Sequence, residues 1–322
     1  MLSVAILGAG QLGSAVAAIL RERATHHVLG PFGRAAREQA LGSGADVVLI
    51  ATTTRFRDVA PDIEAAVRAG SDVLVSAEEC AYPFTVDASL AARLDRLAAD
   101  QGVSIVGCGL NPGLIFDALV LTLLGAAPAD CTIEVRRTVD IGRFGATVLR
   151  RIGIGRGAES FAAGVKRGEI LGHAGFPQSM WVVAAAIGLT LERIETELHP
   201  LITPSAIDLS GRFVIASGES AGVDQTYTGF VQGTRWFTCH FFGHVAPETI
   251  GASPSDEIRL MRGDALVHSL QVLPGLPSQR GSQCMIANSI ERIVNARPGW
   301  RTVAELAPAY PSLAARASRS PA

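Results

Sequence analysis

Two adjacent carboxylates, Glu78 and Glu79, follow an apolar run in the segment VLVSAEECAYPF, residues 73–84. A carboxylate at the end of a buried strand is suited to proton transfer, because desolvation makes it able to act as both acid and base near neutral pH. The alternative is that the acids mark the positive end of a nearby helix. Because adjacent residues point to different sides of the chain, we expect one acid to be catalytic and the other structural.

A glycine motif near the N-terminus predicts a nucleotide site. The motif GAGQLG follows the apolar run LSVAIL and precedes an alanine-rich stretch that ends near Arg23. In this order of strand, tight turn and helix, the backbone approaches a pyrophosphate that is held by helix N–H groups. We expect the loop to bind a dinucleotide through Gly8, Gly10, Gln11, Leu12 and Gly13.

The segment VLGPFGRAAR, about 20 residues beyond the motif, bears on the choice of cofactor. An acid at this position would bind the ribose 2′-hydroxyl of NAD, but the segment has none. It has Arg34 and Arg37, and an arginine suits a 2′-phosphate. We therefore expect NADP, with NAD as a possible cofactor; the alternative is that both arginines are solvated helix residues.

Alternating strands and helices follow the glycine motif. Strands are expected at 45–54, 72–77 and 103–109, and helices at 58–70 and 88–102. This alternation predicts an α/β fold with a Rossmann-type doubly wound parallel sheet. Because parallel strands present their carboxyl ends to one crevice, several strand-end residues should lie with the acid pair and bind the cofactor: Thr52, Thr53, Ser76, Gly109 and Asn111.

Each of these strand-end groups also has a simpler interpretation. Asn111 begins the NPG turn of GCGLNPG and could bond the carboxamide of the cofactor or the substrate, or could belong to a plain interdomain turn. The threonines of ATTT could line the adenosine or ribose, or could cap the next helix.

After residue 125 the pattern changes to strands joined by turns, which predicts a second α+β domain built on an antiparallel sheet. We expect a dinucleotide-binding domain at 1–118, completed by 282–322, and a substrate and dimerisation domain at 119–281. Its expected substrate-binding residues are Phe144, His173, Phe176 and Ser179. A lone histidine is more often structural, so His173 has that alternative. His240 and His244 lack a third ligand at useful spacing, so no metal site is expected.

Composition limits the class of protein. The chain has 322 residues, 48% of them apolar, and a formal net charge of -2, which provides no basic field for nucleic acid. The five scattered cysteines contain no CxxC pair and indicate free thiols. Since the apolar N-terminus breaks into glycines, it indicates neither a signal peptide nor a membrane span, and we expect a cytoplasmic enzyme.

Five segments carry a likeness to a known family: ATTTRFRDVAPDIEAAVRAGSDVLVSAEECAYP, GCGLNPGLIFDALVLTLLG, IGRFGATVLRRIGIG, GHAGFPQS and QCMIANSIERIVNARPG. In these segments, which span most of the chain in order, the protein resembles 2,4-diaminopentanoate dehydrogenases and related native amine dehydrogenases within the dihydrodipicolinate-reductase-like group. The resemblance implies a homodimeric, NAD(P)-dependent enzyme that interconverts an amine with a ketone plus ammonia. It also implies a glutamate of the EE segment as the acid/base, with Glu79 the first choice and Glu78 the second.

The substrate would be a small diamino acid or a simpler amine. If the substrate carries an anion, Arg143, Arg150 and Arg151 are candidate ligands, although surface charges are equally plausible. Two other functions stay open: an imine reductase that acts on a preformed cyclic imine, and a non-catalytic protein that senses NADP.

Overall fold

The computed structural model describes residues 1–312, which form two compact units. The first comprises Met1–Leu119, Trp181–Ala186 and the described part of Pro277–Ala322, and the second comprises Val120–Met180 and Ile187–Leu276. The domain limits expected from the sequence remain a proposal. Residues 313–322 of the expected C-terminal segment lie outside the described residues.

The first unit is built on a six-stranded sheet in which every neighbouring pair is parallel. In the order in which they lie in the sheet, its strands are β14 (Gly299–Arg301), β5 (Ser104–Gly107), β4 (Asp72–Val75), β3 (Val47–Ile50), β1 (Ser3–Leu7) and β2 (His27–Phe32). Its helices are α1 (Gln11–Arg23), α2 (Arg37–Leu41), α3 (Phe56–Arg68), α4 (Ala88–Gln101) and α9 (Ser278–Ile293). Short 3-10 turns lie at η1 (Arg34–Ala36), η2 (Glu78–Ala81), η3 (Pro83–Thr85) and η5 (Val303–Glu305).

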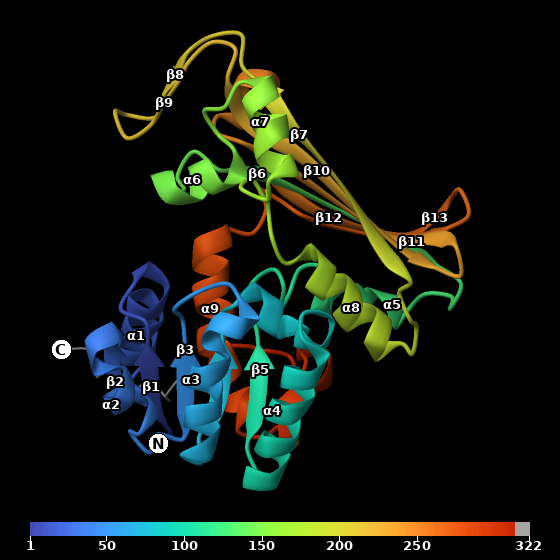
Figure 1. Ribbon diagram of the computed structural model, residues 1–322. Coiled ribbons are helices and arrows are strands. Elements are labelled where there is room, and N and C mark those ends of the chain that lie inside the picture. Colours follow the sequence, from blue (N-terminus) through green and yellow to red (C-terminus); the bar gives the residue numbers. More distant parts are fainter. Residues whose placement is uncertain (313–322) are drawn as a thin grey trace, which may run out of the picture. The chain divides into compact units, whose positions relative to one another are not determined.

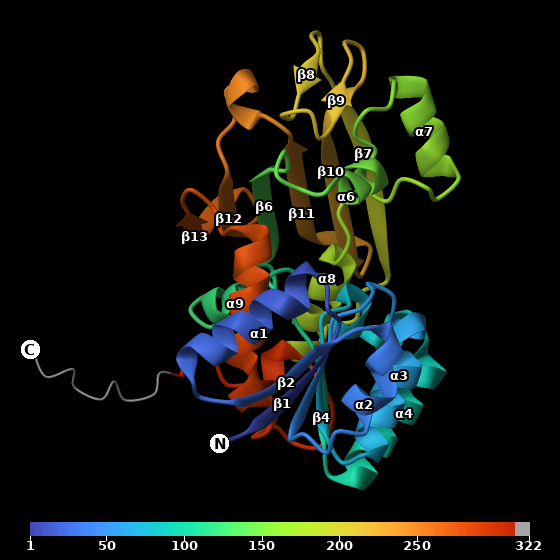
Figure 2. The same ribbon diagram turned by 90° about the vertical axis from the view of Figure 1, so that its left-hand side faces the viewer.

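Helices cover both faces of this sheet (Figures 1 and 2). Successive side chains of a strand point to opposite faces, so Ala5 and Leu7 of β1 pack with α2, α3 and α4, whereas Val4 and Ile6 pack with α1 and α9. Because apolar residues occupy both sides of each central strand, the strands read as continuous apolar runs. The predicted doubly wound parallel sheet is confirmed.

The second unit contains a six-stranded sheet of longer strands. Its strands, in spatial order, are β13 (Ala265–Val272), β12 (Ser255–Arg262), β6 (Thr132–Asp140), β11 (Thr234–His244), β10 (Ser220–Val231) and β7 (Arg193–Ile202). A separate small hairpin is formed by β8 (Ile207–Asp208) and β9 (Val214–Ile215). The other elements of this unit are α6 (Ala146–Ile152), α7 (Ala158–Lys166) and the turn η4 (Pro247–Ile250).

The α+β class of this unit is confirmed, but its sheet is mixed rather than wholly antiparallel. β6 pairs with β11 in parallel, with Val135 opposite Cys239, while all the other neighbouring pairs are antiparallel. The chain between these two strands includes α6, α7 and α8 (Phe176–Ala186), and a crossover of that length permits parallel pairing.

A buried ion pair lies in the second sheet. Arg137 of β6 is 2% exposed, and its guanidinium is 2.8 Å from a carboxylate oxygen of Asp256 on β12. Both groups also bind the backbone of Leu276, whose carbonyl accepts a hydrogen bond from Arg137 and whose N–H donates to Asp256. Loss of one partner would leave the other charge buried without its counter-charge, which costs about 3–5 kcal/mol.

Two helices, α5 (Ala118–Leu124) and α8, contribute residues to both units. Within residues 1–312, no helix combines the length and the apolar character that crossing a membrane requires.

Candidate functional site

The glycine loop between β1 and α1 has the close packing that the motif predicts. Gly8 has a φ of +129°, and a Cβ added there would lie 2.3 Å from the carbonyl oxygen of Ala51. A Cβ on Gly13 would lie 1.9 Å from the carbonyl oxygen of Gly8, so only glycine permits this approach of helix and loop. Beside Gly10, by contrast, there is open space within 4 Å.

The start of α1 suits an anion. The helix has 13 residues and no acid in its first turn, and its N-cap residue Gly10 provides no side-chain hydrogen bond. The first N–H groups of a helix have no partner within the helix and carry the positive end of the helix dipole. These features fit the pyrophosphate of a dinucleotide.

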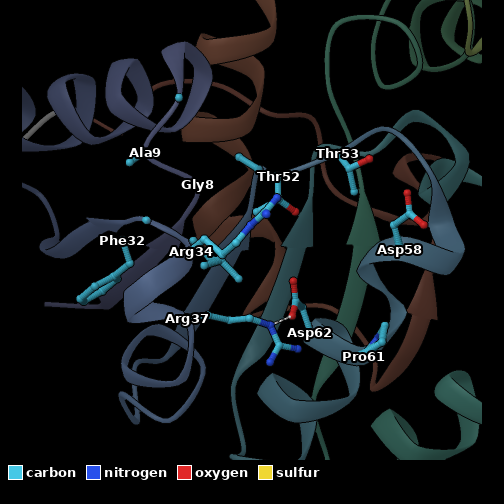
Figure 3. Close-up of a pocket in the computed structure, with 14 residues that line it drawn as sticks. Gly8, Ala9, Phe32, Arg34, Arg37, Thr52, Thr53, Asp58, Pro61 and Asp62 are labelled. Atoms are coloured by element: carbon cyan, nitrogen blue, oxygen red, sulfur yellow. Dashed lines mark hydrogen bonds and ion pairs between the residues drawn. The ribbon is translucent and has the colours of Figure 1, made fainter.

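A cavity of about 720 Å³ adjoins this loop (Figure 3). It is lined by Leu7, Gly8, Ala9, Gly10, Phe32, Gly33, Arg34, Arg37, Ala51, Thr52, Thr53, Asp58, Pro61 and Asp62. The cavity brings the glycine loop, both expected arginines and both expected threonines together. The end of β2 contributes no acid to it, as the sequence indicated.

The two arginines of this cavity have different partners. Arg37 forms an ion pair with Asp62 of α3, whose residue exposure is 8% (Figure 3). Among the described residues, no ion pair involves Arg34, which lies at the first position of η1. Arg34 is thus available for an anionic ligand, whereas the charge of Arg37 is already balanced. Sequence reasoning missed Asp58 and Asp62, because they belong to a helix that follows the next strand.

A second, smaller cavity of about 120 Å³ lies where β4 and β5 end. Its lining residues are Leu12, Ser76, Ala77, Glu78, Cys108, Gly109, Leu110, Asn111, Pro112, Ser282 and Ile286. It therefore joins Leu12 of α1 to four expected strand-end residues, Ser76, Glu78, Gly109 and Asn111. Gln11 has a different place, since its side-chain amide donates to Gln279 of α9 at 2.9 Å.

The two glutamates occupy different positions, as the adjacency argument anticipated. Both are half-buried in η2, but an oxygen of Glu79 accepts a hydrogen bond of 2.7 Å from the backbone N–H of Phe56, the first residue of α3. The N-cap residue of this helix, Arg55, makes no side-chain cap, so Glu79 takes that role. Glu78 lines the smaller cavity. Glu79 is thus engaged at the start of a helix, whereas Glu78 lies at a cavity.

Asp117 supports the turn that contains Asn111. Asp117 is fully buried, and its two carboxylate oxygens accept hydrogen bonds from the N–H groups of Gly113 (2.6 Å) and Ala118 (2.7 Å). The N–H of Leu110 donates to the hydroxyl of Ser282 on α9 at 3.3 Å. Asp117 was not predicted, although an acid immediately before the apolar run ALVLTLL is a recognisable helix-start signal.

Three of the expected substrate-binding residues lie in one part of the second unit. The ring of His173 is 4.8 Å from that of Phe176 and 4.6 Å from that of Phe241. Phe176 and Ser179 are fully buried on α8, and Phe144 is half-buried in the segment after β6.

The loop that carries His173 is held by two hydrogen bonds. Gln225 accepts from the N–H of His173 at 2.8 Å, and the hydroxyl of Tyr227 donates to the carbonyl of His173 at 2.9 Å. Neither support was predicted.

The remaining candidates have surface or structural positions. Arg143, Arg150 and Arg151 are exposed, and Arg150 lies over the ring of Phe213.

The two histidines considered as metal ligands have other partners. His240 on β11 is 2.6 Å from a carboxylate oxygen of Asp224 on β10, and the ring of His244 accepts a hydrogen bond from the N–H of Ala246. Among residues 1–312, no three His, Cys, Asp or Glu side chains cluster in a way that could hold a metal ion.

Burial, with a smaller effect of nearby Arg137, lowers the pKa of His173 from its usual 6.5 to about 3. The unfolded chain therefore binds a proton between these pH values that the folded chain does not, and the free energy of unfolding should fall as pH falls from 6.5 towards 3. The slope for this one group is at most about 1.4 kcal/mol per pH unit.

Urea unfolding at pH 7 and pH 5 measures this effect. His173→Gln should reduce the loss of stability between these two pH values. The matched control His199→Gln, which removes an exposed histidine of β7, should leave the loss unchanged. Equal pH dependence in the wild type and both variants would contradict a depressed pKa of His173.

The parallel sheet, the glycine loop and the strand-edge cavities are those of a Rossmann-type dehydrogenase. Residues 114–319 match the 2,4-diaminopentanoate dehydrogenase C-terminal domain family. The 2,4-diaminopentanoate dehydrogenase of Acetoanaerobium sticklandii is 31% identical over 330 residues, which cover 94% of this chain and 92% of that protein. The chain therefore belongs to the 2,4-diaminopentanoate dehydrogenase family, and this membership implies an oxidoreductase with a nicotinamide cofactor.

Solved structures agree on the fold. The amine dehydrogenase from Mycobacterium smegmatis superposes with a TM-score of 0.80 at 19% identity, covering 97% of each chain. A probable dehydrogenase from Thermotoga maritima has a TM-score of 0.53 at 9% identity, covering 91% of this chain and 88% of its own.

Proposed function

We propose that this protein is an NADP-dependent amine dehydrogenase that interconverts a small amine or diamino acid with its ketone and ammonia. The observation that carries the proposal is the position of Glu78, in a cavity that also contains Leu12 of the glycine-loop helix and the NPG turn. A carboxylate at this edge of the sheet lies where Rossmann-type proteins bind their ligands. Family membership supports an amine as the substrate class.

The proton steps of this reaction suit a single carboxylate. Oxidation of an amine requires loss of a proton from the ammonium group, loss of a hydride from its carbon, and attack of water on the resulting iminium carbon. The nicotinamide cofactor, when bound, accepts the hydride in this direction and supplies it in reverse. Glu78 takes the ammonium proton and releases it to solvent, then takes a proton from the attacking water and returns it to the amine nitrogen, which leaves as ammonia. Asn111 in the same cavity orients the reacting group.

Arg34 supports NADP rather than NAD as the cofactor. Its guanidinium lies in the larger cavity beside the glycine loop, and no acid from the end of β2 lies there to receive a ribose hydroxyl. A guanidinium can bind the 2′-phosphate through two charge-assisted hydrogen bonds. Thr52 and Thr53 are proposed to line the same nucleotide.

The function is tested by the oxidation of NADPH with a panel of small ketones, with and without ammonium. We expect turnover that requires both the ketone and ammonia. Turnover of cyclic imines without ammonia would instead support an imine reductase. No turnover of any substrate, with NADP binding retained, would support a sensor.

We further propose that the protein is a homodimer and that it is located in the cytoplasm. The resemblance of the sequence segments supports the dimer, and the five free cysteines support a reducing compartment. The mass of the protein in solution, measured by light scattering, tests the dimer.

A further inference from the structure

The turn η2, which carries Glu78, rests directly on the backbone of β5. The N–H of Cys80 bonds to the carbonyl of Ala77 at 2.9 Å, which closes the turn. A Cβ added to Gly107 of β5 would lie 2.2 Å from the carbonyl carbon of Cys80 and 2.4 Å from the nitrogen of Ala81. With Cys80 fully buried, the underside of the turn is in contact with protein rather than with water.

Trp300, more than 200 residues further along the chain, lies beneath this turn. Its strand β14 pairs with β5, which places Trp300 beside Ile105. The indole N–H donates a hydrogen bond of 3.2 Å to the carbonyl of Cys80, and only 3% of the residue is exposed. Its backbone N–H is itself anchored at 2.7 Å by a carboxylate oxygen of Asp95 on α4.

The same indole reaches the start of α3. Its ring meets that of Phe56 edge to face, with 5.5 Å between centroids and 89° between planes. The N–H of Phe56 is the group that Glu79 caps. The turn is therefore held at two places, at the Cys80 carbonyl and at the Glu79 carboxylate. Trp300 bonds to the first and packs against Phe56, the residue that donates to the second.

We propose that Trp300 is a positioning residue for Glu78, which it reaches through the Cys80 carbonyl; this inference rests on the proposed proton-transfer role of Glu78. Without the indole N–H, the buried carbonyl of Cys80 loses its partner, and the turn relaxes to find another. A shift of the turn moves Glu78 relative to the reacting atoms. Misplacement by about 1 Å can reduce a rate by about 100-fold.

The test is Trp300→Phe, which keeps a ring against Phe56 but removes the N–H donor. We expect kcat for ammonia-dependent ketone reduction to fall by about 10- to 100-fold. The dissociation constant of NADPH should stay within about twofold, because the nucleotide cavity is untouched. The solvent deuterium isotope effect on kcat should rise, since proton transfer becomes slower. A merely structural role of Trp300 would not alter this isotope effect.

Trp236→Phe is the matched control. Trp236 is 8% exposed on β11, in the other unit, and meets Phe237 edge to face. Its replacement removes a buried indole of similar size without touching η2, so kcat should stay close to the wild-type value. If Trp300→Phe and Trp236→Phe have the same kcat and isotope effect, the proposal is overturned.

Two further variants keep the outcome decisive. If Trp300→Phe does not fold, Asp95→Ala replaces it, since this change loosens the backbone of Trp300 and leaves the core intact; an unchanged kcat would then overturn the proposal. If Glu78→Gln is inactive while Trp300→Phe has normal kinetics, only the positioning role fails. An active Glu78→Gln variant would remove both this inference and the proton-transfer role of Glu78.

Discussion

Glu78→Gln should lower kcat for the ammonia-dependent reduction of a ketone by about 10²- to 10⁴-fold, the range that general acid–base groups contribute. The amide has nearly the shape of the carboxylate but does not exchange a proton at neutral pH. Because Glu78 lines the small cavity and not the nucleotide cavity, the dissociation constant of NADPH should change by less than about twofold. Stopped-flow NADPH oxidation and fluorescence titration measure the two quantities.

Glu79→Gln is the matched control at the adjacent position. A glutamine oxygen can still accept the hydrogen bond from the N–H of Phe56, so this variant should keep its fold and most of its activity. Some stability should be lost, because a neutral cap interacts less with the positive end of α3. If Glu79→Gln were inactive and Glu78→Gln active, the roles assigned to the two acids would be reversed.

Arg34→Ala should weaken NADP binding by about 10- to 100-fold, because a hydrogen bond to a charged group contributes about 1.5–3 kcal/mol. Binding of NAD, which lacks the 2′-phosphate, should change by less than about twofold. The ratio of the two dissociation constants, measured calorimetrically at one ionic strength, therefore reports the role of Arg34. Arg34→Lys should keep part of the preference, since lysine retains the charge without the planar pair of donors.

Arg96→Ala provides the control for net charge. Arg96 is an exposed residue of α4 and does not line the nucleotide cavity. Its removal changes the charge of the protein by the same amount, but the ratio for NADP and NAD should not move. An equal loss of NADP preference in the Arg34 and Arg96 variants would mean that the preference arises from the general field and not from the cavity.

Much of the first unit could be predicted because its signals are local. The run LSVAIL followed by GAGQLG specifies strand, turn and helix over neighbouring residues, and alternation of such units restricts the sheet to a parallel arrangement. The second unit was harder. Exposed residues of β7 do not alternate regularly with less exposed ones, and the parallel pairing of β6 with β11 joins strands far apart in the chain. Neither the exposure pattern of β7 nor the pairing of β6 with β11 can be recognised from a short stretch of sequence.

The candidate site also combines residues that could be placed from the sequence with residues that could not. The loop glycines, the two arginines and the strand-end residues could be placed at one edge of the sheet because parallel strands all end there. The partners of these residues could not. Asp62, which balances Arg37, and Asp117, which holds the NPG turn, come from elements whose packing follows from the whole sheet.

By itself, the sequence determined the class of the fold and the likeness to a family, and it predicted the edge of the sheet at which ligands should bind, since periodicity, glycine spacing and strand direction act along the chain. Only the tertiary structure decided which acid of the pair faces a cavity. Successive side chains in a 3-10 turn project about 120° apart, so one of the two had to turn away from the other. Helix α3 begins next to Glu79, and Trp300 bonds to the carbonyl of Cys80 in the same turn. Because of this packing, Glu79 caps a helix and Glu78 lines the cavity.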